Sequence, residues 1–107
     1  MTPRRAQVSR TTRETTVECC LVLDGDGSAE VATGLGFLDH MLEGLSRHAG
    51  LRLSLEVSGD LEVDDHHTIE DCALVLGEAL DLALGDKRGL ARFGHAYAPL
   101  DESLARV

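Results

Sequence analysis

Residues 64–71 hold the densest group of side chains able to bind a metal ion: two adjacent histidines, a glutamate and several aspartates. If a helix begins here, His66 lies four residues before Glu70 and His67 three residues before it, so Glu70 can reach either imidazole. The two imidazoles diverge by about 100° around an α-helix. The spacing therefore predicts a metal site at which one helix offers His66, His67 and Glu70 as ligands in two directions.

The start of this helix is also marked in the sequence. Asp64 and Asp65 are natural N-cap residues, and Thr68 with Asp71 has the spacing of a weaker capping box. The positive end of the helix dipole disfavours a charged imidazolium, and neutral imidazole is the form that binds a metal. The competing interpretation is a surface helix start with a polar cap. The register of Glu70 and the further histidines elsewhere favour the metal site.

A second pair of histidines is expected on a helix over residues 37–49. Apolar residues recur at helical spacing along one face of it, namely Phe37, Leu38, Met41, Leu42 and Leu45. His40, Gly44 and His48 lie on the opposite face, where the glycine leaves bare backbone against which a ligand could lie. His40, beside Asp39, stays open between a ligand and an exposed polar residue. His48, taken alone, is interpreted as an exposed polar residue.

The composition restricts the class of protein. A chain of 107 residues is long enough for one small domain, residues 1–107. Its net charge of −9 argues against a nucleic-acid or anionic-membrane partner, because both need clustered lysine and arginine. No signal peptide or stretch of transmembrane length is visible, so a cytoplasmic location is expected.

Cys19, Cys20 and Cys72 form no Cys-x-x-Cys pair and are expected to be small buried hydrophobes in a reducing compartment.

The remaining pattern predicts an α+β fold, with two helices layered on a mostly antiparallel sheet. Strands are expected over residues 15–23, 29–33, 51–57 and 90–98, and the Asp-Gly turn at 24–27 predicts that the first two form a hairpin. Helices are expected over 37–49 and 66–84, the second ended by Gly85. Residues 1–10 are expected to include a frayed end, and residues 101–107 could begin a helical turn.

The second helix is expected to bury a stripe comprising Ile69, Cys72, Ala73, Leu76, Leu80 and Ala83. Because Leu74, Val75 and Leu82 make it apolar nearly all round, it is expected to be covered on more than one side. In isolation the chain would then expose hydrophobic surface, and it is expected to aggregate, self-associate or remain loosely packed.

Four segments occur in order along the chain: Arg10-Thr-Thr-Arg-Glu14-Thr, Thr33-Gly-Leu-Gly-Phe-Leu-Asp-His40-Met-Leu, Gly59-Asp-Leu-Glu-Val-Asp-Asp-His66-His67-Thr-Ile-Glu70-Asp and Gly89-Leu-Ala-Arg92-Phe-Gly. Taken together, with their order and spacing, they resemble the imidazoleglycerol-phosphate dehydratase family. The resemblance covers essentially the whole of this chain but only the first half of a family chain.

The resemblance implies one half of a duplicated two-repeat fold, of the ribosomal protein S5 domain 2-like type. It implies a cytoplasmic hydro-lyase that converts D-erythro-imidazole glycerol phosphate, a small-molecule substrate, to imidazole acetol phosphate in L-histidine biosynthesis. It further implies two Mn²⁺ ions per complete active site and a homo-oligomer, a 24-subunit shell in the family. The second paired-histidine helix belongs to the other half, so this chain alone is expected to be inactive.

The resemblance also assigns site residues. It implies that His40, His66 and Glu70 bind one manganese ion, that His67 binds the other, and that all four line the substrate site. Glu14 and His48 resemble residues that contact the substrate, and Arg92 matches an arginine that holds its phosphate. Glu14 and Glu70 are both candidates for carrying the proton, as is a glutamate of the other half. Arg13 stands where the family usually has lysine, a change that keeps the charge.

Two other functions stay open. The first is a non-enzymatic metal-binding or assembly module that keeps the helix pair without catalysis. The second is a generic metallohydrolase, which is weaker because His-His-x-x-Glu lacks the His-Glu-x-x-His order that places a base beside the metal-bound water.

Overall fold

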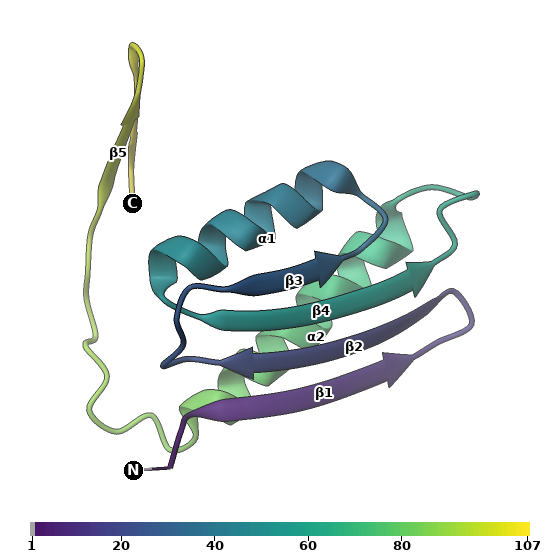
Figure 1. The fold of residues 1–107 in the computed structure, drawn as a ribbon, viewed down its shortest axis with the longest axis horizontal. Helices are drawn as coiled ribbons and strands as arrows, with labels where there is room; N and C mark the ends of the chain where they lie inside the picture. Colours follow the sequence, from purple (N-terminus) through teal and green to yellow (C-terminus); the bar gives the residue numbers. More distant parts are fainter. Residues whose placement is uncertain (1) are drawn as a thin grey trace.

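Six strands and two helices make up the structure, a computed structural model that describes residues 2–107. The strands are β1 (Arg5–Thr11), β2 (Thr15–Val22), β3 (Ala29–Ala32), β4 (Arg52–Gly59), β5 (Tyr97–Leu100) and β6 (Ser103–Arg106), and the helices are α1 (Gly36–Ala49) and α2 (His66–Leu84). The first four strands form one sheet in the order β1-β2-β4-β3, antiparallel except for the β3–β4 pair (Figure 1). The predicted α+β class with a mostly antiparallel sheet is confirmed.

Strand β4 lies between β2 and β3, so the predicted hairpin of residues 15–23 with 29–33 is wrong. The Asp-Gly segment closes no hairpin because its backbone is bonded to the junction of α1 and β4, where Gly25 N–H donates to the Gly50 carbonyl at 3.0 Å. A Cβ on Gly25 would lie 2.3 Å from the backbone nitrogen of Arg52, too close for any side chain. β3, α1 and β4 therefore form a β-α-β unit, with α1 as the crossover between parallel strands.

One face of the sheet is apolar and packs against the helices. Alternate residues of β2 and β4 face it in register, as Cys19 opposite Leu55 illustrates. α2 crosses β1 and β2, and α1 lies along β3 and β4 (Figure 1). Leu42 of α1 and Val75 of α2 belong to the same hydrophobic core as the strand residues. The predicted strand over 51–57, with one buried and one wet face, is confirmed as β4.

The face of helix α1 that packs against the core differs from the face that its apolar spacing predicts. Three of the predicted core residues are exposed, namely Phe37, Met41 and Leu45. The buried residues are Leu42 and Ser46. The Ser46 hydroxyl lies 3.0 Å from the Ser28 carbonyl and 3.2 Å from the Leu51 carbonyl, so it can donate to either. These polar contacts orient the helix, which leaves an apolar stripe on its outer side.

Helix α2 has the predicted bounds and ends at Gly85, but it is also rotated about its axis. Its buried residues are Thr68, Asp71, Cys72, Val75, Ala79 and Ala83. Of the predicted stripe only Cys72 and Ala83 are buried, while Ile69, Ala73 and Leu80 are exposed. Within residues 2–107, α2 is not covered by protein on more than one side, although such cover was expected. No helix in this range is both long and apolar enough to span a membrane.

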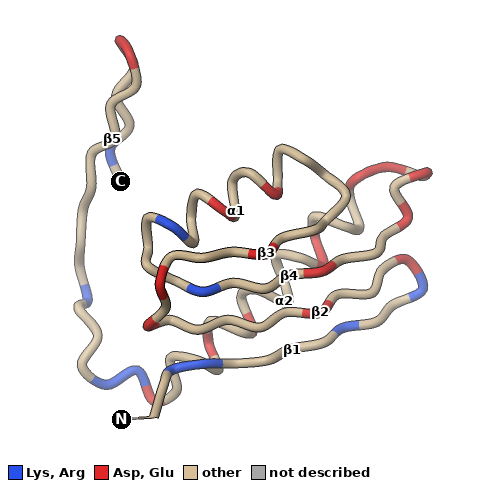
Figure 2. Tube along the Cα trace, viewed as in Figure 1, with Lys and Arg blue, Asp and Glu red and all other residues tan. Residues whose placement is uncertain are grey.

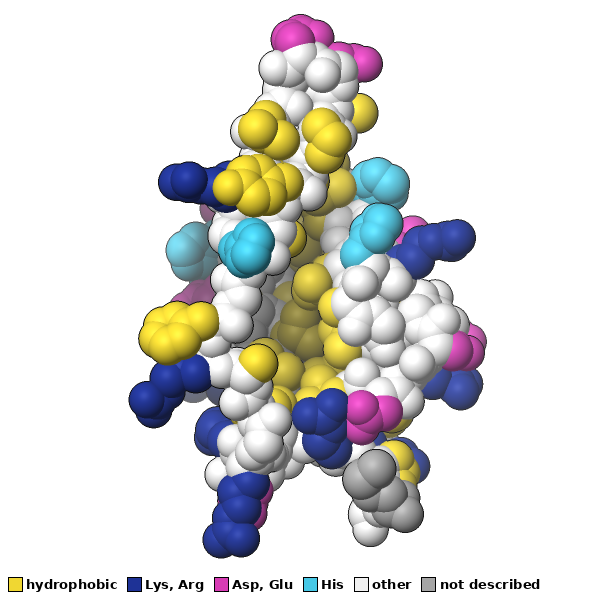
Figure 3. Space-filling view, turned by 90° about the vertical axis from the view of Figure 1, so that its left-hand side faces the viewer, with side chains coloured by type: hydrophobic (Ala, Val, Ile, Leu, Met, Phe, Trp, Pro, Cys, Tyr) yellow, Lys and Arg dark blue, Asp and Glu magenta, His cyan; other side chains and the backbone are white. Residues whose placement is uncertain are grey.

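The two ends of the chain also differ from expectation. Within residues 1–10, where a frayed end was expected, residues 5–10 belong to β1, which pairs along its whole length with β2, and Met1 lies outside the described residues. Most of the predicted strand over 90–98 is irregular, and residues 101–107 form β6 rather than a helical turn. The β5–β6 ribbon stands apart from the body (Figure 1), and its residues are exposed. Figure 3 shows hydrophobic side chains lining the hollow between the C-terminal segment and the rest of the molecule.

Candidate metal centre

The first predicted pair, His66 and Glu70, lies on the first turns of α2. His66 Nε2 is 3.4 Å from Glu70 Oε2, and both side chains are more than half exposed. The two residues are brought together because they are one helical turn apart. Two atoms that each lie about 2.1 Å from one ion are about 3.0 Å apart at a right angle and about 3.4 Å apart at the tetrahedral angle. The spacing of this pair therefore fits two ligands of one divalent ion.

His67 is held by a carboxylate from outside the helix. Its Nδ1 lies 2.8 Å from Oδ2 of Asp60, in the connection between β4 and α2. This hydrogen bond is the main reason that the pKa of His67 is raised from 6.5, while desolvation opposes the shift. The charges of Asp60, Glu14 and Asp64 raise the pKa further. A carboxylate only accepts, so Nδ1 carries the proton and Nε2 is left as the metal-binding nitrogen.

The two imidazoles at the start of α2 are oriented differently. Their ring centroids are 5.7 Å apart and their planes are at 89°. His66 meets its carboxylate through Nε2, whereas His67 meets its carboxylate through Nδ1. One helix start therefore presents two imidazoles with different partners and different orientations.

The cap of α2 partly differs from the prediction. Asp64 Oδ1 accepts the backbone N–H of His66 at 2.9 Å, so Asp64 satisfies one of the free amides of the first turn. Asp65 is the N-cap residue by position but makes no side-chain cap bond. The predicted capping box of Thr68 and Asp71 does not form, because Thr68 Oγ1 is buried without a partner and Asp71 bonds to Thr15 instead.

His40 and His48 lie on the exposed side of α1. No residue of α1 comes within 8 Å of a residue of α2, measured between Cα atoms, in the described parts of both helices. Within residues 2–107, no three His, Cys, Asp or Glu side chains are grouped closely enough to hold a metal ion. The structure therefore unites His66 with Glu70 but does not add His40 to them. The neighbouring Asp39 carboxylate accepts from the Thr33 backbone at 3.0 Å and so fixes the start of α1.

Glu14 lies in the turn between β1 and β2, at the end of the sheet where α2 begins (Figure 1). It lines a shallow depression of about 250 Å³ together with Gly59, Asp60 and Glu62. Asp60 also binds His67, so Glu14 and His67 border the same region. Figure 2 shows acidic residues gathered on the connection between β4 and α2, and an acidic beside a basic residue at the β1–β2 turn. Nothing in the periodicity marks Glu14; the Thr-x-x-Thr pattern around it, which forms the turn, is the only local signal.

Arg92 lies in the irregular segment between α2 and β5 and is exposed. No ion pair of Arg92 forms within the described residues. The structure therefore does not bring the predicted phosphate-binding arginine to a partner.

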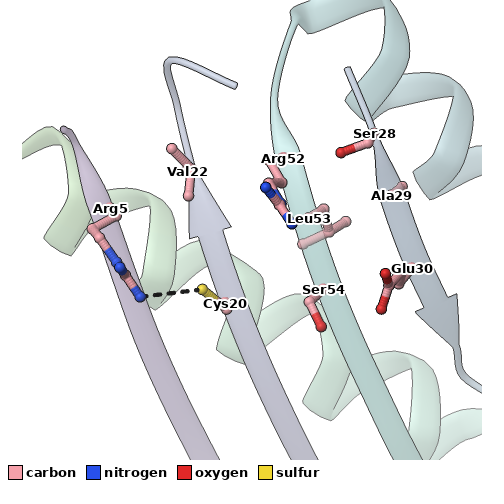
Figure 4. Close-up of a pocket in the computed structure, with 9 residues that line it drawn as sticks. All are labelled: Arg5, Cys20, Val22, Ser28, Ala29, Glu30, Arg52, Leu53 and Ser54. Atoms are coloured by element: carbon pink, nitrogen blue, oxygen red, sulfur yellow. Dashed lines mark hydrogen bonds between the residues drawn. The ribbon is translucent and has the colours of Figure 1, made fainter. Parts of the chain in front are cut away.

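A depression of about 440 Å³ lies on the opposite face of the sheet from the helices (Figure 4). It is lined by Arg5, Cys20, Val22, Ser28, Ala29, Glu30, Arg52, Leu53 and Ser54, and Figure 4 shows Arg5 reaching toward Cys20 across neighbouring strands. None of the predicted site residues belongs to it. The predicted site therefore lies elsewhere on the surface.

The ligand set is chemically suited to a borderline or hard divalent ion. Imidazole nitrogen and carboxylate oxygen, without thiolate, suit manganese, although zinc and iron bind the same groups. His66 and Glu70 would supply two ligands, and His67 would supply one to a separate ion. The chain fits such ions only as part of a coordination sphere, since each ion needs further ligands.

Comparison with known proteins gives one consistent family. A family model described as imidazoleglycerol-phosphate dehydratase matches residues 33–107. A protein of that name from Salinibacter ruber is 60% identical over 105 residues, which cover 98% of this chain and 52% of the relative. One from Methanothermobacter thermautotrophicus is 58% identical over 107 residues, covering 100% of this chain and 55% of the relative. The chain thus spans about half the length of the curated relatives it matches.

A solved structure gives the same result. The crystal structure of imidazoleglycerol-phosphate dehydratase from Staphylococcus aureus matches with a TM-score of 0.78 and 37% sequence identity. The match covers 95% of this chain and 54% of that chain. The sheet and both helices therefore have a counterpart in about half of a larger protein.

Proposed function

This chain belongs to the imidazoleglycerol-phosphate dehydratase family, and from that premise we propose that it supplies one half of a hydro-lyase active site. The reaction is the dehydration of imidazole glycerol phosphate to imidazole acetol phosphate, a step of histidine biosynthesis in the cytoplasm. The observation that carries the proposal is the His66–Glu70 pair, two potential ligands 3.4 Å apart at the start of α2. They lie in the segment that carries the family resemblance.

The chemistry requires three roles. The substrate loses a hydroxyl from the carbon next to its imidazole ring and a proton from the following carbon. A bound divalent cation, Mn²⁺ in this proposal, would stabilise negative charge on that ring. A carboxylate must carry the proton, and an arginine suits the phosphate because its planar guanidinium gives paired charge-assisted hydrogen bonds.

This chain has candidates for each role. His66 and Glu70 would bind one cation, with His40 brought in by assembly, and His67 would bind the second. Glu14 and Glu70 are candidates for the proton carrier, Glu14 and His48 for contacts with the substrate, and Arg92 for its phosphate. Asp60 would keep Nε2 of His67 free by holding the proton on Nδ1.

Assembly is part of the proposal, because two ligands do not complete a coordination sphere. The exposed apolar residues of the two helices support it: these include Phe37, Met41 and Leu45 on α1 and Ile69, Leu74 and Leu80 on α2. An apolar surface of this kind on a folded domain indicates contact with another protein surface. We propose that the other half of the fold and further copies of the chain cover it in a homo-oligomer.

The test uses a chimera in which these residues are joined to the second half of the Salinibacter ruber relative. With Mn²⁺ added, turnover of imidazole glycerol phosphate is expected from the chimera and not from residues 1–107 alone. Glu70→Gln should abolish turnover and weaken Mn²⁺ binding, measured by electron paramagnetic resonance. Glu78→Gln, on the same helix and also exposed, is the matched control and should change neither. Robust turnover by residues 1–107 alone would overturn the idea of shared ligands.

A non-enzymatic metal-binding or assembly module remains the second candidate, because the described residues gather only two potential ligands at one point. It predicts Mn²⁺ binding without dehydration, even in the chimera. Restored turnover separates the enzyme from the module, since only the enzyme predicts it.

A further inference from the structure

Asp71 is a buried carboxylate at which three elements meet. It lies on α2 directly after Glu70, and only 8% of its side chain is exposed. Its Oδ2 accepts a hydrogen bond from the Thr15 hydroxyl of β2. Its Oδ1 lies 3.3 Å from Nε of Arg10 of β1. Both oxygens are thus used to join the first turns of α2 to the β1–β2 hairpin.

The hydrogen bonds continue from Asp71 into the turn that carries Glu14. Thr15 Oγ1 lies 3.2 Å from Thr12 Oγ1. Thr15 gives its only hydroxyl proton to the carboxylate, so Thr12 must donate to Thr15. The Thr12 hydroxyl in turn accepts the backbone N–H groups of Glu14 at 3.1 Å and of Thr15 at 3.0 Å. The backbone of Glu14 is therefore held between two threonines that are themselves fixed by Asp71.

The side chain of Glu14 extends toward the same region as His67. It lines the depression that also contains Asp60, whose carboxylate binds His67. Thr15 and Asp71, whose hydrogen bond joins the hairpin tip to the start of α2, are 56 residues apart in sequence. No other side-chain hydrogen bond or ion pair joins this turn to α2 within the described residues. This network is thus the side-chain link between the turn that carries Glu14 and the helix that carries the histidine pair.

We propose that Asp71 is a positioning residue for the dehydration: through Thr15 and Thr12 it fixes Glu14 in the region that His67 borders. This inference rests on the proposed function for its chemical meaning, and on the hydrogen-bond network for its geometry. Asp71 itself does not contact the substrate. A purely structural role would instead predict a loss of stability that is independent of Glu14.

The first test measures the network without any assay of activity. Thr15→Val removes the hydroxyl that links Asp71 to the turn, and Thr15→Ser keeps it. Amide hydrogen exchange at Glu14 should be about tenfold faster or more in Thr15→Val, as expected for loss of a buried hydrogen bond. It should be restored in Thr15→Ser. The amide of Ser28, bonded to Asp26 at 3.0 Å in another turn, serves as the internal control. Unchanged exchange at Glu14 would overturn the proposal.

The second test is a double-mutant cycle on kcat in the chimera, with Glu14→Gln and Thr15→Val. Thr15→Val is expected to lower kcat about tenfold when Glu14 is present and less than about twofold in the Glu14→Gln background. Leu21→Ala, which removes a buried side chain near the end of β2 opposite to Thr15, should lower stability without changing kcat. Additive effects of the two substitutions would refute a role through Glu14. Absence of turnover in the unmodified chimera would refute the proposed function, while the exchange rates would still decide whether the network holds the turn.

Discussion

Asp60 accepts a hydrogen bond from Nδ1 of His67 at 2.8 Å, and its other carboxylate oxygen, Oδ1, is buried without a partner. Among the described residues, His67 is therefore the single side-chain partner of a carboxylate that is mostly withdrawn from water. Because Nδ1 is engaged, Nε2 remains for another group. The relationship explains both the orientation of His67 and the direction of its pKa.

Replacing Asp60 should change both the pKa of His67 and the pH dependence of stability. The raised pKa means that the charged pair stabilises the fold fully below pH 6.5, the ordinary value, and that this contribution is lost as pH rises through the raised pKa. Asp60→Asn should thus lower the pKa of His67 and destabilise the fold more below pH 6.5 than at alkaline pH. NMR titration and urea unfolding measure the two effects. Asp86→Asn, in the exposed C-terminal segment, is the control, and an unchanged pKa in Asp60→Asn would contradict the prediction.

Substitutions at Leu55 and Phe37 should separate the core from the outer surface. Leu55 is 1% exposed in the central strand β4, whereas Phe37 is 76% exposed. Leu55→Ala should lower the free energy of unfolding by about 2–5 kcal/mol, because it leaves a cavity. Phe37→Ala should change it by less than about 0.5 kcal/mol, as is usual for exposed residues. Chemical denaturation measures both, and a larger loss from Phe37→Ala would show that α1 packs with its other face inward.

The apolar stripe of α1 should drive self-association of the isolated chain. Replacing Phe37, Met41 and Leu45 together by serine should shift the population toward monomer, because less apolar surface then gains from burial. Analytical ultracentrifugation over a range of concentrations measures the shift. The control is the double replacement of Leu100 and Leu104 by serine on the separate β5–β6 ribbon. A sharply unfolding monomer before any substitution would contradict the prediction.

The three cysteines should react at different rates. Burial is the main cause that raises the pKa of Cys19 and of Cys72 to about 11, so few thiolates exist at neutral pH and they are shielded. Cys20 points to the open face of the sheet and is only half-buried. Iodoacetamide should therefore modify Cys20 first in the folded chain, as mass spectrometry can follow. In denaturant the three rates should converge, and rapid labelling of Cys19 in the folded state would indicate a loosely packed core.

The sequence predicted which segments form helices and strands better than it predicted which strands lie side by side. Helix α2 and its end at Gly85 follow from capping and periodicity, and β4 follows from the alternation of residues 51–57. The hairpin prediction failed because a turn signal does not reveal which strand lies beside which. Here the loop after β2 is bonded to the end of α1, so β4 takes the place next to β2.

Helix faces and long-range polar contacts were the other sources of error. The apolar residues of α1 predicted the wrong inner face, because Ser46 is buried by hydrogen bonds to two carbonyls. Asp71 was expected in a capping box, but its partner is Thr15 on a distant strand. The spacing of His66 and Glu70 predicts their proximity because it is local to one helix. The position of Glu14 depends on a contact between distant segments, which spacing along the chain does not encode.

The close approach of Gly25 to Arg52 has a consequence for engineering this fold. The segment between β2 and β3 is at the surface, yet even one added methyl group there would collide with the backbone that starts β4. Tags, fluorescent reporters or grafted peptides inserted at this bend would thus disturb the path of the backbone between β2 and β3. The turn at residues 101–102, at the tip of the exposed β5–β6 ribbon, carries none of the proposed site residues and offers a safer place for such an insertion.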